Sequence, residues 1–158
     1  MKKRNFVTKK MATIGFFCLW MLSSNLAFAD KFERQVGQQL LNAAKTFDEM
    51  NNYKQTHDPH VGKIYTRRNT KPKILTLILE PGMSYAILGV CDDDCRNIDL
   101  DLYNESGRLI DSDHQFDDKP LVKVSPNRTA VFQLKITIPS CATHRCTYGI
   151  GVFGKVNY

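Results

Sequence analysis

The sequence predicts a mainly β fold: an antiparallel β-sandwich or jelly roll of about eight strands, preceded by one amphipathic α-helix. Three observations predict this class. Residues 31–52 space their apolar side chains as a helix does. From residue 61 onward, short apolar runs are separated by turn-forming residues. Within residues 131–138, the apolar residues Phe132, Leu134, Ile136 and Ile138 alternate with the polar residues Gln133, Lys135 and Thr137, as in a strand with one buried face.

The chain begins with the three-part layout of a secretory signal peptide. A basic start (2–10) precedes an uncharged, mostly apolar run (11–22), and small residues follow at Ala27 and Ala29. We expect cleavage between Ala29 and Asp30. The apolar run is short of the roughly 20 residues that span a bilayer, so we expect no stable membrane span after cleavage. The protein is then exported, either to the periplasm or to the extracellular medium.

Cleavage would change the charge of the chain. The whole sequence carries a net charge of +6, from 22 basic and 16 acidic residues. The leader contains five of the basic residues and no acidic residue, which leaves a net charge of +1 on the mature chain. A nearly neutral chain lacks the strong positive field that favours nucleic acid, so we expect no nucleic-acid partner. Its length suits one domain.

The predicted helix covers residues 31–52, where one stripe is apolar and the opposite face is polar with charges of both signs. The stripe consists of Phe32, Val36, Leu40, Ala43, Ala44, Phe47 and Met50. A helix docked on the domain is one interpretation; oligomerisation through the 31–52 helix is another. The mixed charges disfavour a membrane-surface helix. Residues 53–60 are polar and are expected to form a linker to the sandwich domain at 61–158.

The candidate strands of the sandwich are 61–66, 73–79, 83–91, 97–103, 107–111, 120–124, 130–138 and 146–153. Turn signals such as Pro81-Gly82 and Ser106-Gly107 lie between them. Residues 74–79 are apolar on both faces apart from Thr76. A strand that is apolar on both faces is typical of a sheet interior, so we expect this strand to be central or covered by the helix.

Four cysteines remain after the leader: Cys91, Cys95, Cys141 and Cys146. An even number in an exported chain predicts disulfides, for which three pairings are possible. We favour Cys91–Cys95 and Cys141–Cys146, because each pair brackets a polar loop. Rings this short stabilise by only about 2 kcal/mol in the chain-entropy model, so we expect the bonds to pin loops. A zinc site is the alternative, but the spacings are not those of a zinc ribbon.

The stretch 97–113 (NIDLDLYNESGRLIDSD) combines a strand of alternating Asp and apolar residues, a turn with Gly, and a strand ending in acidic residues. It resembles the bacterial pre-peptidase C-terminal domain, a small β-sandwich found on secreted proteases and other exported proteins. Asp99, Asp101, Gly107 and Asp111 occupy the matching positions. Two flanking motifs, Gly82-x-x-Tyr85 and 148–152, also resemble strands of that family. The stretches that match are short, and the helix, the cysteine pairs and the missing protease domain are departures. The resemblance implies a binding or accessory module more than a catalyst.

The acidic residues of this hairpin are the candidate site. Asp99 and Asp101 point to the same face of one strand, roughly 6.6–6.8 Å apart. With Asp111 and Asp113, they could supply the oxygen ligands that calcium prefers. The resembled family includes calcium binders. The alternative is that these carboxylates lie on a solvated strand face and cap turns. No other cofactor is expected.

No catalytic residue is assigned. The sequence contains neither a Gly-x-Ser-x-Gly elbow nor a His-Glu-x-x-His pair. It therefore favours a non-catalytic exported module that binds a protein, a glycan or the cell envelope. One alternative is a calcium-dependent binding module that uses the acidic hairpin. Another is a small secreted enzyme or inhibitor with a carboxylate site.

Overall fold

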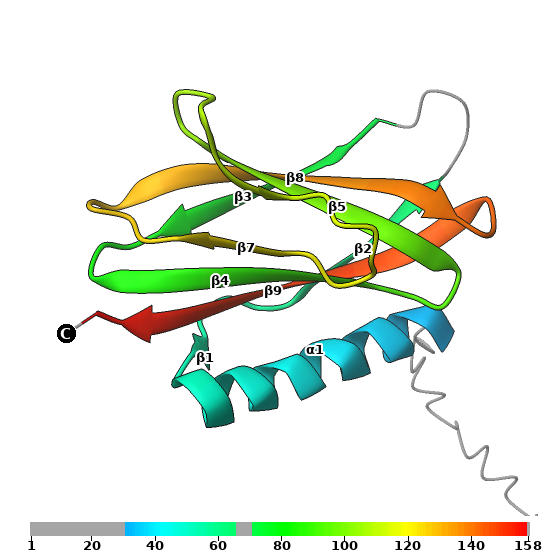
Figure 1. Ribbon diagram of the computed structural model, residues 1–158, viewed down its shortest axis with the longest axis horizontal. Helices are drawn as coiled ribbons and strands as arrows, with labels where there is room; N and C mark the ends of the chain where they lie inside the picture. Colours follow the sequence, from blue (N-terminus) through cyan, green and yellow to red (C-terminus); the bar gives the residue numbers. More distant parts are fainter. Residues whose placement is uncertain (1–30, 66–70, 158) are drawn as a thin grey trace, which may run out of the picture.

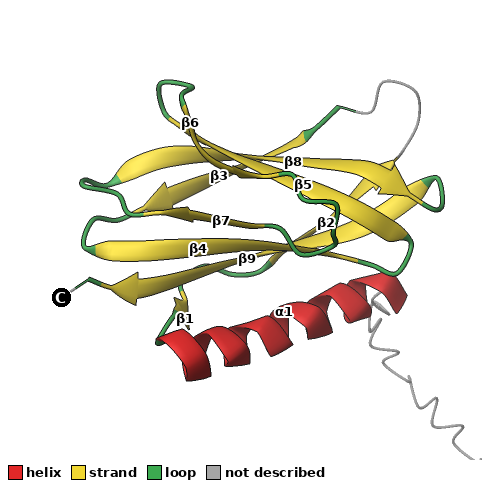
Figure 2. Ribbon diagram, viewed as in Figure 1, coloured by secondary structure: helices red, strands yellow, loops and turns green. Residues whose placement is uncertain are grey.

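The computed structural model describes residues 31–65 and 71–157. The predicted cleavage position between Ala29 and Asp30 lies outside these residues. The described chain is mainly β, with nine strands in two antiparallel sheets and one helix, as the sequence predicts (Figures 1 and 2). The two sheets face each other as layers, and the helix α1 (Lys31–Asn51) lies on the outside of one of them (Figure 1).

The first sheet has the strand order β1-β9-β4-β7, and β2 also pairs with β9. Its strands are β1 (Lys54–Gln55), β2 (His60–Tyr65), β4 (Met83–Cys91), β7 (Leu121–Val124) and β9 (Arg145–Val156). The second sheet has the order β3-β8-β5-β6. Its strands are β3 (Lys73–Leu79), β5 (Cys95–Asn104), β6 (Leu109–Asp113) and β8 (Ala130–Cys141). All eight expected strands are present, and the expected linker contains the ninth, β1.

The core lies between the two sheets and follows the predicted alternation. On β8, Phe132, Leu134 and Ile136 are buried, whereas Gln133 is exposed. Their partners on the first sheet include Ile87 of β4, which is fully buried. One face of each sheet is therefore packed against the other sheet, and the outer faces differ: α1 covers part of the first sheet, and no helix of the described chain covers the second (Figure 1).

The position expected for the 74–79 strand is wrong. This strand, β3, is at the edge of the second sheet and pairs with β8 alone. It is not covered by α1, which packs against the first sheet. Its apolar residues divide between two environments: Leu77 and Leu79 are buried in the core, whereas Ile74 and Ile78 are 56% and 61% exposed on the outer face. The apolar run therefore reflects an exposed apolar edge, not a sheet interior.

Helix α1 docks on the first sheet, as the first interpretation of its apolar stripe predicts. Val36 and Leu40 are buried against Leu88 and Val90 of β4. The helix approaches β9 closely at Gly149, where a Cβ atom would lie 2.5 Å from Val36 Cγ1. Further along, the rings of Phe47 and Phe153 stack with centroids 4.7 Å apart. No helix among the described residues is both long and apolar enough to cross a membrane.

Candidate functional site

The four aspartates of the acidic hairpin are divided between its two faces. Residues directly opposite in an antiparallel pair point to the same side of the sheet. Asp99 and Asp101 lie opposite Thr137 and Lys135, on the outer face. Asp111 and Asp113 lie opposite Leu102 and Leu100, whose side chains are in the core. The structure therefore does not direct the four carboxylates toward one point.

On the outer face, Asp101 is only 6% exposed because the side chains of Lys135 and His114 cover it. Lys135 Nζ donates a hydrogen bond to Asp101 Oδ2 at 3.0 Å, and His114 Nε2 lies 2.7 Å from Oδ1. The hydrogen bond with Asp101 also raises the pKa of Lys135. Both carboxylate oxygens are therefore engaged by neighbouring side chains, an arrangement that joins β5 to β8 and to the segment after β6.

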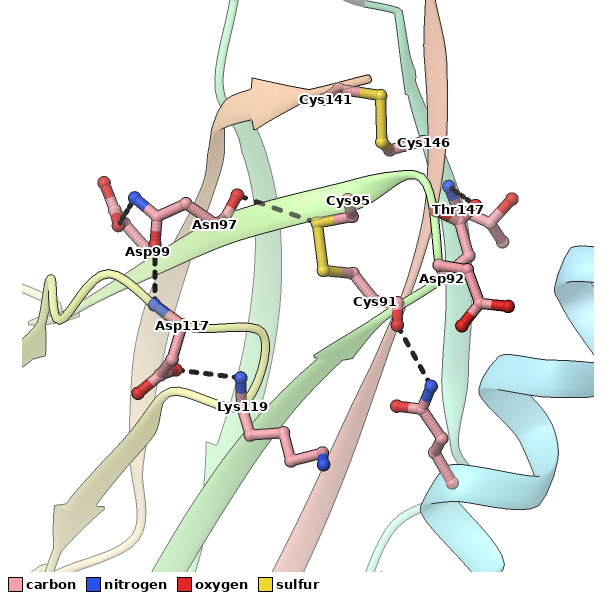
Figure 3. The surroundings of a disulfide bond; sticks show 12 residues. Cys91, Asp92, Cys95, Asn97, Asp99, Asp117, Lys119, Cys141, Cys146 and Thr147 are labelled. Atoms are coloured by element: carbon pink, nitrogen blue, oxygen red, sulfur yellow. Dashed lines mark hydrogen bonds between the residues drawn. A yellow bond between two sulfur atoms is a disulfide. The ribbon is translucent and has the colours of Figure 1, made fainter. Parts of the chain in front are cut away.

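Asp99 occupies a different environment on the same face. It accepts a hydrogen bond from Asn97 Nδ2 at 3.1 Å. Burial raises the pKa of its carboxyl group, and the charge of nearby His114 partly opposes that shift. The buried Asn97 also accepts a hydrogen bond from the backbone N–H of Asp117, so it ties the β6–β7 loop to β5 (Figure 3).

Asp111 and Asp113 turn toward the first sheet and bind the free edge of β7. Asp111 Oδ2 accepts a hydrogen bond from the backbone N–H of Lys123 at 2.7 Å. Asp113 Oδ2 accepts one from the N–H of Leu121 at 2.9 Å. These amides face away from β4, the strand that β7 pairs with in the first sheet. The two carboxylates therefore take the place of a neighbouring strand and join the two sheets.

Within residues 31–65 and 71–157, no three acidic, His or Cys side chains form a group that could hold a metal ion. The hairpin carboxylates are instead bound to protein donors. The alternative from the sequence was a solvated strand face whose carboxylates cap turns, and it did not include the bonds of Asp111 and Asp113 to the edge of β7. The calcium site at Asp99, Asp101, Asp111 and Asp113 stays a prediction, and its formation would require these side chains to rearrange.

Both disulfides lie at one end of the sandwich (Figure 3). Their pairings are the two that the sequence favours, Cys91–Cys95 and Cys141–Cys146. Each bond links a strand of the first sheet to a strand of the second. The first joins Cys91, the last residue of β4, to Cys95, the first residue of β5, and the second joins Cys141, the last residue of β8, to Cys146 near the start of β9. They therefore do more than pin loops: they cross-link the two layers.

Asp92 shapes the turn that carries the first disulfide. Its backbone carbonyl accepts a hydrogen bond from the N–H of Cys95, which closes the turn. The Asp92 carbonyl is therefore not available to β9, and the Asp92 carboxylate takes its place: Oδ2 accepts a hydrogen bond from the N–H of Thr147 at 2.6 Å. Asp92 is 2% exposed. This acidic residue is thus part of the fold and not a surface ligand.

A cavity of about 600 Å³ opens at the other end of the sandwich, between the β5–β6 turn and the β7–β8 loop. Its floor is apolar and includes Val124, Ala130 and Phe132. Its rim is polar and includes Asn104, Glu105, Ser106, Arg108, Ser125, Asn127 and Arg128. A concave site with an apolar floor and a few polar groups is typical of ligand pockets, and this volume is in their usual range. We call it the loop-end pocket.

The rim of the loop-end pocket is held by local interactions. Asn104 Oδ1 accepts hydrogen bonds from the backbone N–H groups of Ser106 and Arg108, which shapes the β5–β6 turn. Arg128 forms an ion pair with Glu105 across the opening. In the described chain, no hydrogen bond or ion pair engages the guanidinium group of Arg108. The sequence predicts these segments only as breaks between strands, since nothing in it shows that the two turns meet.

Comparisons with known proteins add little. No protein-family model and no curated protein matches the chain. Among solved structures, one similar chain is PliG from Aeromonas hydrophila, a periplasmic lysozyme inhibitor of g-type lysozyme. The two share 7% identity at a TM-score of 0.44, over 61% of this chain and 84% of that chain. So weak a likeness supports no conclusion about family or function, and the resemblance to the pre-peptidase C-terminal domain stays a prediction.

Proposed function

We propose that this chain is an exported, non-catalytic β-sandwich module that binds another protein through the loop-end pocket. The leader-like N-terminus and the two disulfides support export, since disulfides persist in oxidising compartments. The observation that carries the binding proposal is the apolar floor and polar rim of the pocket. Loops at the end of a rigid sandwich commonly carry recognition.

The lining of the pocket suggests the chemistry of the partner. Phe132, Val124 and Ala130 offer an apolar floor to one inserted side chain. Arg108 at the rim offers a guanidinium group without another partner in the described chain, and this group binds carboxylates and carbonyls well. We therefore propose that a loop of the partner inserts an apolar side chain and places a carboxylate or a backbone carbonyl against Arg108.

A photo-crosslinking residue at Asn127, on the exposed rim, tests this proposal in cells that export the protein. The control carries the same residue at His144, which is exposed in the loop of the second disulfide. We expect a specific protein adduct from Asn127 and none from His144. Arg108→Glu should reduce the adduct at least about tenfold. Arg96→Glu, an exposed arginine outside the pocket, should leave it unchanged.

Several outcomes would contradict the proposal. Equal adducts from both positions, or an adduct that ignores Arg108→Glu, would place the contact elsewhere. An adduct that disappears with a chelator would favour the calcium-dependent alternative. Hydrolase activity of the purified protein that a single Asp substitution abolishes would favour the enzyme alternative. A complete lack of protein adducts would exclude a protein partner at this pocket.

A further inference from the structure

Three charged side chains lie on the rim of the loop-end pocket, and two of them already bind each other. Glu105 and Arg108 belong to the β5–β6 turn, and Arg128 belongs to the β7–β8 loop on the other side of the opening. The Arg128–Glu105 ion pair therefore spans the opening. Among the described residues that line the pocket, Glu105 is the only acidic one. One of the two rim cations is thus neutralised by the protein's own carboxylate.

The backbone around Glu105 is fixed, whereas its side chain is weakly held. Asn104 Oδ1 accepts hydrogen bonds from the N–H groups of Ser106 and Arg108, which holds the turn. The side chain of Glu105 is 45% exposed and that of Arg128 is 65% exposed. Exposed ion pairs contribute little stability, because water solvates and screens both charges. Another anion can therefore replace Glu105 at Arg128 at little cost.

We infer, on the basis of the proposed function, that Glu105 occupies the place of an acidic group of the partner. On binding, a carboxylate of the partner displaces Glu105 from Arg128. The partner surface then combines an apolar side chain for the floor, the acceptor proposed above for Arg108, and an acidic side chain for Arg128 on the opposite side of the pocket. The partner is therefore a protein with an acidic surface around one apolar residue.

Charge favours an acidic partner over a basic or neutral one. Once Glu105 is displaced, two guanidinium groups on opposite sides of the pocket face the partner, and no carboxylate of the described lining does. Guanidinium groups bind carboxylates through two parallel hydrogen bonds, which are stronger than those to neutral groups. A bound partner also excludes water, so the new ion pair is screened less than the exposed pair that it replaces. The exchange of one carboxylate for another at Arg128 therefore favours the bound state.

Glu105 also contributes to specificity in this arrangement. A partner without an acidic group at this position either leaves the Arg128–Glu105 pair across the opening or separates the pair without replacing it. The first outcome keeps the opening partly closed, and the second leaves Arg128 without its anion. Both outcomes weaken binding, so Glu105 acts against partners that lack the carboxylate.

The photo-adduct formed from Asn127 measures the role of Glu105. Glu105→Gln keeps the shape of the side chain but removes its charge, so it should raise the adduct yield at least about threefold at low expression. Arg128→Gln should lower the yield by a similar factor. In the Arg128→Gln background, Glu105→Gln should change the yield by less than about twofold, because Glu105 competes through Arg128. Asp58→Asn removes an exposed acid outside the pocket and should have no effect.

The outcomes distinguish the role of Glu105 from the binding role of the pocket. A lack of any adduct would contradict the proposed function, and the role of Glu105 with it. An adduct that Arg108→Glu removes but Glu105→Gln leaves unchanged or lowers would overturn the role of Glu105 alone. So would an equal gain from Glu105→Gln with and without Arg128, or an equal gain from Asp58→Asn, which would assign the effect to net charge. Matching circular dichroism spectra of the purified variants would show that each is folded.

Discussion

The two lateral sides of the sandwich treat their exposed strand edges in opposite ways. On one side, the edge amides of β7 are bound by the carboxylates of Asp111 and Asp113 from β6. On the other side, β3 has no neighbouring strand at its outer edge, and a side chain reaches that edge only near its end, where His57 Nε2 lies 3.1 Å from the carbonyl oxygen of Ile78. The comparison shows that an edge can be closed by side chains that imitate a strand, without proline, lysine or a bulge.

The two sides also show which polar and apolar residues stabilise an edge and which are exposed at one, a distinction that the sequence does not make. Asp111 and Asp113, which the sequence suggests as ligands for a cation, bind the edge amides of β7. The apolar strand 74–79, which the sequence suggests as a sheet interior, is instead the edge strand β3. We therefore expect substitutions on the β6–β7 side to change stability more than substitutions on the exposed outer face of β3.

The largest expected effect comes from opening the closed side. Removing both carboxylates with Asp111→Ala and Asp113→Ala leaves two backbone amides of β7 without acceptors. A hydrogen bond to a charged group contributes about 1.5–3 kcal/mol, and these two are partly exposed, so we expect a loss of about 2–4 kcal/mol together. Urea unfolding measures this loss of free energy of unfolding. Asp58→Ala, at an exposed position, should change the free energy of unfolding by less than about 0.5 kcal/mol. Equal effects would contradict the edge-capping role.

Proline substitutions test which backbone groups of β3 point outward. Proline removes an N–H donor, which β-sheets tolerate only at a free edge. Thr76→Pro should therefore be tolerated, because the N–H of Thr76 points away from β8. Leu75→Pro should cost about 1–3 kcal/mol more, because it removes a hydrogen bond to β8. Urea unfolding of both variants measures the two losses of stability. Equal losses would mean that the N–H groups of Leu75 and Thr76 do not point to opposite sides of β3.

The acidic hairpin also predicts a pH dependence at Asp99. Burial raises the pKa of its carboxyl group above 3.8. The folded state therefore binds this proton more tightly than the unfolded chain. The resulting stabilisation is complete below about pH 3.8 and is lost as the pH rises through the folded pKa. Asp99→Asn should thus raise the urea midpoint at neutral pH, with a gain that shrinks on acidification. A gain that is independent of pH would exclude this cause.

The smallest expected effect is that of calcium. Asp101, Asp111 and Asp113 already bind protein donors, and they lie on different faces of the hairpin. We therefore expect millimolar calcium and a chelator to give the same thermal midpoint. A ligand that binds only the folded state would raise it. A clear rise that Asp111→Ala removes would show that the hairpin rearranges into the predicted calcium site.

Much of the fold follows from local pattern. The period of the apolar residues places α1 and eight strands within a few residues of their observed limits, because helix and strand faces repeat every few positions along the chain. The spacing of the four cysteines indicates the pairings that the structure contains. Asp111 and Asp113 illustrate where local pattern ends: the sequence identifies them as polar hairpin residues, but not the amides that they bind.

The sequence by itself therefore determines where the strands, the helix and the turns lie, since each depends on neighbouring residues. Only the tertiary structure decides that β3 is an edge, that the disulfides join two sheets, and that the loop-end pocket exists. These features depend on pairings between segments that are distant in the chain. A strand such as 74–79 has the same residues whether it has one neighbour or two, so only the sheet order reveals its exposed edge.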